Sequence, residues 1–119
     1  MVAIAQVNGH TVLEVEPNGP LLGSERDATD LLSEAFSADA TIIVLPVERL
    51  DPQFLQLRSG LAGAFIQNLQ NYERRLFIVG DISAAIEASA ALRDFVYETN
   101  KVGRHRFIAD RAALTTALS

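Results

Sequence analysis

The chain opens with two short runs of mostly apolar residues, 2–7 and 10–16, which are separated by Asn8-Gly9. Asn-Gly tolerates the positive φ angles of a type I′ turn, whose twist matches that of two flanking antiparallel strands. The pattern therefore predicts an N-terminal β-hairpin. Its second strand ends at Pro17, because proline lacks the backbone donor that a β-ladder needs.

Three later segments carry apolar residues at the three- and four-residue spacing of an amphipathic helix. Ser24 and Asp27 resemble a capping box at the start of the first helix. The second helix is predicted over about 59–72, and a final helix runs from Asp110 to Ser119. The three inward faces consist of Ala28, Leu31, Leu32, Ala35 and Phe36; of Leu61, Ala62, Phe65, Ile66 and Leu69; and of Leu92, Phe95, Val96 and Thr99.

Two runs, 41–45 and 75–80, are apolar throughout, which is typical of parallel strands covered on both faces. A short strand follows at 106–109, and the alanine-rich segment 81–91 is expected to be a loop with some helix. The order ββαβαβαβα predicts a single α/β domain with a mixed, mostly parallel sheet. A chain of 119 residues suits one such domain.

Composition excludes several kinds of chemistry. The chain has no cysteine, so it has neither disulfides, thiolate metal ligands nor a cysteine nucleophile. The formal net charge of −5 argues against a generic nucleic-acid binder. Positive charge gathers around Lys101, Arg104, His105 and Arg106, which we interpret as a solvated loop and strand edge; a patch for an anion or an acidic partner is the alternative.

The N-terminal segment lacks the positive region of a signal peptide, and Gln6, Asn8 and His10 interrupt its apolar run. No apolar stretch approaches the ~20 residues of a membrane span. We therefore expect a soluble, cytoplasmic protein that makes no membrane contact.

Several blocks in the C-terminal half resemble an uncharacterised bacterial family catalogued as domain of unknown function 4180. The likeness begins at Pro52, and it brings no activity with it. The blocks are Ser59-Gly60-Leu61-Ala62-Gly63, Asn71-Tyr72, Ile78-Val79-Gly80-Asp81-Ile82-Ser83 and Leu92-Arg93-Asp94-Phe95-Val96-Tyr97-Glu98-Thr99-Asn100-Lys101.

The element order, with Ser59-Gly60-Leu61 opening a helix after a buried strand, also resembles the STAS domain of anti-sigma-factor antagonists. In those domains an Asp-Ser-Ser/Thr-Gly-Leu motif places a phosphorylatable hydroxyl at a helix N-terminus. Here Arg58 stands where that motif has its acid, and the connection from strand to serine is longer. The resemblance implies a STAS-like fold and a regulatory domain that binds another protein.

Two groups of residues are candidates for a binding site. The first lies where the buried strands end, since ligands of open α/β sheets gather beyond the carboxyl ends of parallel strands. Glu48 falls on this edge too, and the acids there are interpreted first as helix caps. Ser59 is either an ordinary N-cap or an anion site strengthened by Arg58. The candidates are Asp51, Arg58, Ser59, Gly60, Asp81 and Ser83 on this edge, and Arg93, Asp94, Glu98, Asn100 and Lys101 on the third helix.

The third-helix residues form a polar face, solvated by default and a docking face in the alternative. His10 and His105 lack ligand-spaced acids, so no metal site is expected, and no phosphate- or dinucleotide-binding glycine loop is present. We expect neither a cofactor nor catalytic residues. The favoured function is a non-catalytic module that binds an unidentified protein, with a homodimer also considered. A sensor of a small ligand or anion at the carboxyl edge is the second hypothesis, and an enzyme using a carboxylate or serine there is the third.

Overall fold

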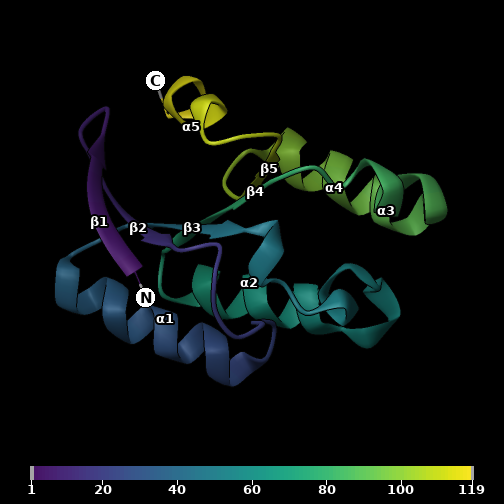
Figure 1. The fold of residues 1–119 in the computed structure, drawn as a ribbon, viewed down its shortest axis with the longest axis horizontal. Coiled ribbons are helices and arrows are strands. Elements are labelled where there is room, and N and C mark those ends of the chain that lie inside the picture. The colour runs from purple at the N-terminus through teal and green to yellow at the C-terminus, as the bar shows by residue number, and fades with distance from the viewer. Residues whose placement is uncertain (1, 119) are drawn as a thin grey trace.

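The computed structural model describes residues 2–118, which form one mixed five-stranded sheet with helices packed against it (Figure 1). The strands are β1 (Val2–Val7), β2 (His10–Val15), β3 (Ile42–Pro46), β4 (Arg75–Val79) and β5 (Arg106–Ile108). The helices are α1 (Glu25–Ala38), α2 (Leu61–Asn71), α3 (Ser83–Ala88), α4 (Ala90–Val102) and α5 (Ala112–Ala117). Three 3₁₀ helices, η1 (Val47–Arg49), η2 (Pro52–Leu55) and η3 (Leu57–Ser59), connect β3 to α2.

The predicted hairpin is present in the expected register. Asn8 and Gly9 have φ angles of 48° and 83°, and Val7 pairs with His10 across the two-residue turn. Both positive φ angles are those that a type I′ turn requires. β1 is therefore antiparallel to β2 and lies at the edge of the sheet.

The strand order is β1-β2-β3-β4-β5, and every pair after the hairpin is parallel. Because each right-handed crossover adds the next strand on the same side, the connecting helices gather on one face of the sheet. Residues of α1 and α2 accordingly share one core cluster, against which Phe95 of α4 also packs. Leu114 of α5 and Leu118 belong to a second cluster on the opposite face (Figure 1).

β3 and β4 are adjacent and parallel, and both faces of this pair are covered, as predicted. Ile43 and Leu45 face α1 and α2, whereas Ile42 and Val44 face the α5 side. Phe65 of α2 has no exposed surface, so the inward face assigned to this helix is confirmed at its centre.

Three details differ from the sequence prediction. Phe36 is 47% exposed, because its ring packs edge-on against Tyr72 outside the core. α2 begins at Leu61, after the separate turn of η3, whereas the segment 81–91 contains α3, in line with the expected loop with some helix. α5 ends at Ala117, and Ser119, the predicted end of this helix, lies outside the described residues.

Within residues 2–118, none of the helices has the length and apolar character needed to cross a membrane.

Candidate functional site

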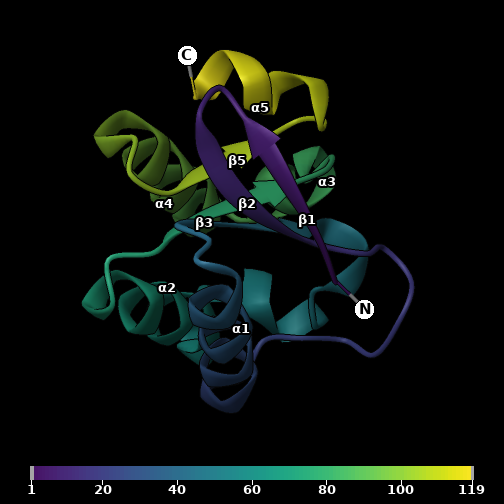
Figure 2. The same cartoon turned by 90° about the vertical axis from the view of Figure 1, so that its left-hand side faces the viewer.

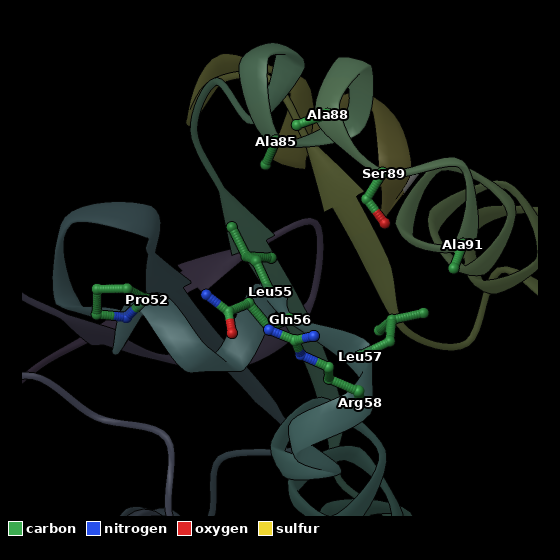
Figure 3. Close-up of a pocket in the computed structure, with 9 residues that line it drawn as sticks. All are labelled: Pro52, Leu55, Gln56, Leu57, Arg58, Ala85, Ala88, Ser89 and Ala91. Carbon is green, nitrogen blue, oxygen red and sulfur yellow. The ribbon is translucent and has the colours of Figure 1, made fainter.

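An apolar groove of about 680 Å³ lies beyond the carboxyl ends of β3 and β4 (Figure 3). One wall comes from η2 and η3, which follow β3, and the other comes from α3 and the start of α4, which follow β4. The lining residues are Pro52, Leu55, Gln56, Leu57, Arg58, Ala85, Ala88, Ser89 and Ala91.

The first wall is fixed by local capping and by one buried aromatic anchor. Asp51 accepts a hydrogen bond from the Gln53 N–H at 2.9 Å, and Pro52 occupies the first position of η2. Phe54 is fully buried and packs edge-on against Phe65 of α2. The anchored Phe54 leaves its neighbours Leu55 and Leu57 at the surface of the groove.

The second wall is built from small side chains on two consecutive helices. Ser89 separates α3 from α4 with an extended backbone, and its hydroxyl accepts a hydrogen bond from the Leu92 N–H at 3.1 Å. Ala85 and Ala88 of α3 and Ala91 of α4 lie on either side of Ser89 along this wall (Figure 3). Small side chains on this wall allow another backbone to approach closely.

Arg58 is the one charged side chain among the residues that line the groove, and it lies across from the alanine wall (Figure 3). The residue is exposed, whereas the leucines next to it are partly buried. The groove therefore combines mostly apolar walls with a single positive charge at its rim.

Ser59 and Gly60 follow Arg58, but their arrangement differs from the predicted N-cap. Ser59 ends η3, and Gly60, with a φ of 77°, occupies the cap position of α2. The Ser59 hydroxyl accepts a hydrogen bond from the Leu61 N–H at 3.2 Å and donates one to the Gln53 carbonyl at 2.6 Å. Ser59 thus ties η2 to the start of α2, and its hydroxyl is already engaged on both sides.

Asp81 and Ser83 lie at the end of β4 and bond to one another. The Asp81 carboxylate accepts hydrogen bonds from the Ser83 hydroxyl at 2.6 Å and the Ser83 N–H at 2.9 Å. These two bonds lower the pKa of Asp81 below its ordinary value. Asp51 therefore caps η2, as the sequence predicted, whereas Asp81 bonds to Ser83 and α3 has Ile82 at its cap position without a side-chain cap bond.

Glu48 does not join the other two acids. It lines a separate hollow of about 500 Å³ at the carboxyl ends of the strands, together with Glu14 and Glu16. Arg111 pairs with Glu14 in this hollow. Within residues 2–118, no three or more histidine, aspartate or glutamate side chains gather closely enough to hold a metal ion.

The predicted polar face of α4 lies outside the groove. Arg93, Asp94, Glu98 and Lys101 are exposed, and Arg93 approaches Asp94 at 3.5 Å, which offsets the like charges of Asp94 and Glu98. Asn100 instead binds the backbone of β5: its side chain accepts from the Phe107 N–H at 2.7 Å and donates to the Phe107 carbonyl at 3.2 Å. The role of Asn100 is therefore structural.

The basic cluster near the end of α4 also divides between surface and interior. Arg104 is exposed, but His105 is only 6% exposed, so the prediction of a solvated loop is wrong at this residue. The His105 Nδ1 accepts a hydrogen bond from the Leu76 N–H at 3.0 Å, and its Nε2 lies 3.2 Å from the Gln70 side-chain oxygen. Burial, together with the charges of Arg104 and Arg75, lowers the pKa of His105 to about 4.

A family model described as a domain of unknown function, DUF4180, matches residues 7–118. The chain belongs to this family. The match extends the likeness seen from Pro52 onward back to Val7, the last residue of β1, so β2 to β5 lie within the family's domain. No curated protein and no solved structure matches the chain.

The sequence pattern pointed to Arg58 at the rim of the groove but not to the apolar side chains of its walls. Leu55 and Leu57 carry no helical or strand periodicity, because they lie in two short 3₁₀ helices. The alanines of 84–91 were visible as a cluster of small residues. Their role as a wall depends on the opposite segment, which only the tertiary structure supplies.

Proposed function

We propose that this domain is a protein-interaction module whose groove binds an amphipathic helix of a partner protein that carries an acidic residue. The observation that carries the proposal is the apolar groove between η2–η3 and α3–α4, with Arg58 at its rim. Helix-in-groove recognition uses such a surface. Apolar side chains of the helix pack into the groove, and charge at its rim sets the orientation and the selectivity of binding.

The composition of the walls favours a helix over a small molecule. Sites for small ligands place several polar groups toward one point. Here the polar lining residues are Gln56, Arg58 and Ser89, and the Ser89 hydroxyl already caps α4. The leucines and alanines of the two walls offer apolar contact along an open surface, which suits a row of side chains from a helix.

The STAS resemblance points in the same direction, since those domains act by binding other proteins. The serine of that motif is a phosphorylation site in them. In this chain Arg58 lies beside Ser59, and the acid of the motif is missing. We therefore propose regulation through partner binding that does not depend on phosphorylation of Ser59.

A small amphipathic anion is the second candidate ligand. The volume of about 680 Å³ lies within the range of ligand pockets, and Arg58 would pair with a carboxylate or phosphate whose apolar tail lies on Leu55. Such a ligand would compete with the helix for the groove. An anion that binds in the groove is therefore expected to displace a bound helical peptide, whereas an anion that binds at another site is not.

The test is a display selection of amphipathic helical peptides against the wild-type domain, with counter-selection against Ala88→Glu. Ala88 lines the groove on α3, whereas Ala84, four residues earlier, is exposed and does not line it. The expected peptides bind wild type and Ala84→Glu equally, lose affinity for Ala88→Glu, and carry an apolar face with at least one acid. If no enriched peptide distinguishes Ala88→Glu from Ala84→Glu, the groove is not the binding surface.

A further inference from the structure

The two edges of the sheet differ in how their backbone groups are satisfied. At the β5 edge, the Asn100 side chain bonds both the N–H and the carbonyl of Phe107, so another strand cannot pair there. Arg106 adds a charge to this short strand. Such protection is a common means of preventing edge-to-edge association.

The β1 edge has none of these protections within the described residues. β1 reads Val-Ala-Ile-Ala-Gln-Val, without a charge or a proline, and its register with β2 is unbroken from Val2 to Val7. Ile4, at its centre, is 49% exposed. Figure 2 shows β1 on the near side of the sheet, with α1 below it and α5 above it.

The register also determines which backbone groups of β1 are free. Hydrogen-bonded and non-hydrogen-bonded pairs alternate along an antiparallel ladder, and the pair that closes a two-residue turn is hydrogen-bonded. Val7 closes this turn with His10, so Val7, Ala5 and Ala3 bond to β2. The N–H and carbonyl groups of Val2, Ile4 and Gln6 therefore point toward the open edge.

We propose that β1 is a dimerisation edge, on which a second copy of this chain adds its own β1 in antiparallel orientation. The two copies are related by a twofold axis that passes between their Ile4 residues. In this register Ile4 lies opposite Ile4 of the copy, and Val2 lies opposite Gln6. Each outward N–H then meets an outward carbonyl, and the two sheets become one. This inference is independent of the groove, which lies at the carboxyl ends of the strands.

The side chains at this edge fit a second copy of the chain. All six residues of β1 are uncharged, so a twofold axis brings no like charges face to face along the paired strands. Ile4 borders a hollow of about 380 Å³ between β1 and α1, which Ser33, Glu34, Ser37 and Ala38 of α1 also line. The Ile4 side chain of the copy reaches this hollow and buries apolar surface that the single chain leaves exposed.

The experiment measures the mass of the protein in solution at about 100 µM chain, which saturates an interface of micromolar dissociation constant. We expect twice the chain mass for the wild type and a dimer affinity at least about tenfold lower for Ile4→Lys, which places like charges opposite one another. Val102→Lys is the matched control, because Val102 is 79% exposed on α4. This variant is expected to keep the wild-type mass.

A cross-linking experiment tests the register. The chain has no cysteine, so Ile4→Cys introduces a single thiol. Residues in a hydrogen-bonded antiparallel pair have Cα atoms about 5.5 Å apart, within the range of a disulfide. Oxidation is expected to give a covalent dimer of Ile4→Cys but not of Val102→Cys. A monomeric wild type, a dimer that Ile4→Lys leaves intact, or equal cross-linking of both thiols would overturn the proposal.

Discussion

The imidazole of His105 is the hydrogen-bond acceptor for a backbone N–H at the start of β4. Its Nδ1 accepts a hydrogen bond from the Leu76 N–H at 3.0 Å. The proton of the neutral ring then resides on Nε2, which faces the side-chain oxygen of Gln70 at 3.2 Å. A protonated ring has no acceptor for Leu76. The fold therefore requires His105 to be neutral, consistent with burial and with the nearby charges of Arg104 and Arg75.

This arrangement predicts that acid weakens the fold below pH 6.5. The pKa of His105 is about 4 in the folded chain and about 6.5 in the unfolded one, so the unfolded state takes up its proton first as pH falls. Stability from this residue is complete above about pH 6.5 and is lost progressively toward pH 4. Between about pH 7 and pH 5 the expected loss is about 2 kcal/mol.

Urea unfolding of wild type and His105→Gln at these two pH values measures the effect. The variant is less stable at neutral pH but is expected to lose about 2 kcal/mol less between the two values. His10→Gln controls for the loss of an imidazole as such. A wild-type and a His105→Gln protein with the same pH dependence would contradict the assigned role of the ring.

Arg49 and Gly19 predict a second stability effect. Arg49 is 4% exposed and donates from Nε to the Pro20 carbonyl at 2.7 Å and from Nη1 to the Glu16 carbonyl at 2.8 Å. A Cβ added at Gly19 would lie 2.8 Å from the Arg49 guanidinium carbon, and the φ of Gly19 is +142°. Gly19→Ala is therefore expected to destabilise the fold by about 1–3 kcal/mol.

Gly63→Ala is the matched control for this glycine substitution. Gly63 lies inside α2, and an added Cβ there meets no atom within 4 Å. The control is expected to stabilise the fold by about 0.5–1 kcal/mol, because alanine favours a helix. Two substitutions with effects of the same sign in urea unfolding would show that the contact between Gly19 and Arg49 is misassigned.

Phe65 and Phe36 test the assignment of buried faces. Phe65 has no exposed surface and packs edge-on against Phe54 with ring centroids 5.5 Å apart, so Phe65→Ala is expected to cost about 3–5 kcal/mol. Phe36→Ala removes a ring that is nearly half exposed and is expected to cost less than about 1.5 kcal/mol. Denaturant titration gives both values. A loss below about 1 kcal/mol for Phe65→Ala would contradict the described core.

Ser59→Glu tests the rim of the groove from a neighbouring position. The substitution removes the donor that bonds the Gln53 carbonyl at 2.6 Å, so we expect a stability loss of about 1 kcal/mol and a folded domain. The added carboxylate beside Arg58 is expected to lower the affinity for an acidic peptide by about tenfold. Calorimetry with Ser59→Ala as control separates the charge from the lost hydroxyl. Equal affinities for the two variants would make Ser59 a structural residue only.

The sequence predicted those parts of the fold whose cause is local. The positive φ angles demanded at Asn8-Gly9 set the hairpin, and the continuous apolar run 41–45 identified a strand covered on both sides. Phe36 shared the helical period of the buried residues but packs against Tyr72 and Arg74 outside the core. Its exposure depends on these tertiary contacts, which periodicity does not contain.

The candidate site was predicted only in part, because its walls come from segments that follow different strands. Arg58 was recognised from its place beside a helix start, yet the alanines opposite it become a wall only when β3 and β4 lie side by side. Asn100 had the appearance of a surface residue on a polar face. Its bonds to Phe107 depend on the position of β5.

Charge reversal at Arg58 tests the proposed function most directly. Two selected peptides with the same apolar face, one with an acidic and one with a basic rim residue, are titrated by calorimetry into wild type and Arg58→Glu. We expect the wild type to prefer the acidic peptide and Arg58→Glu to prefer the basic one, each by about tenfold. If both proteins bind the two peptides with equal affinity, Arg58 does not face the partner and the groove is not the docking surface.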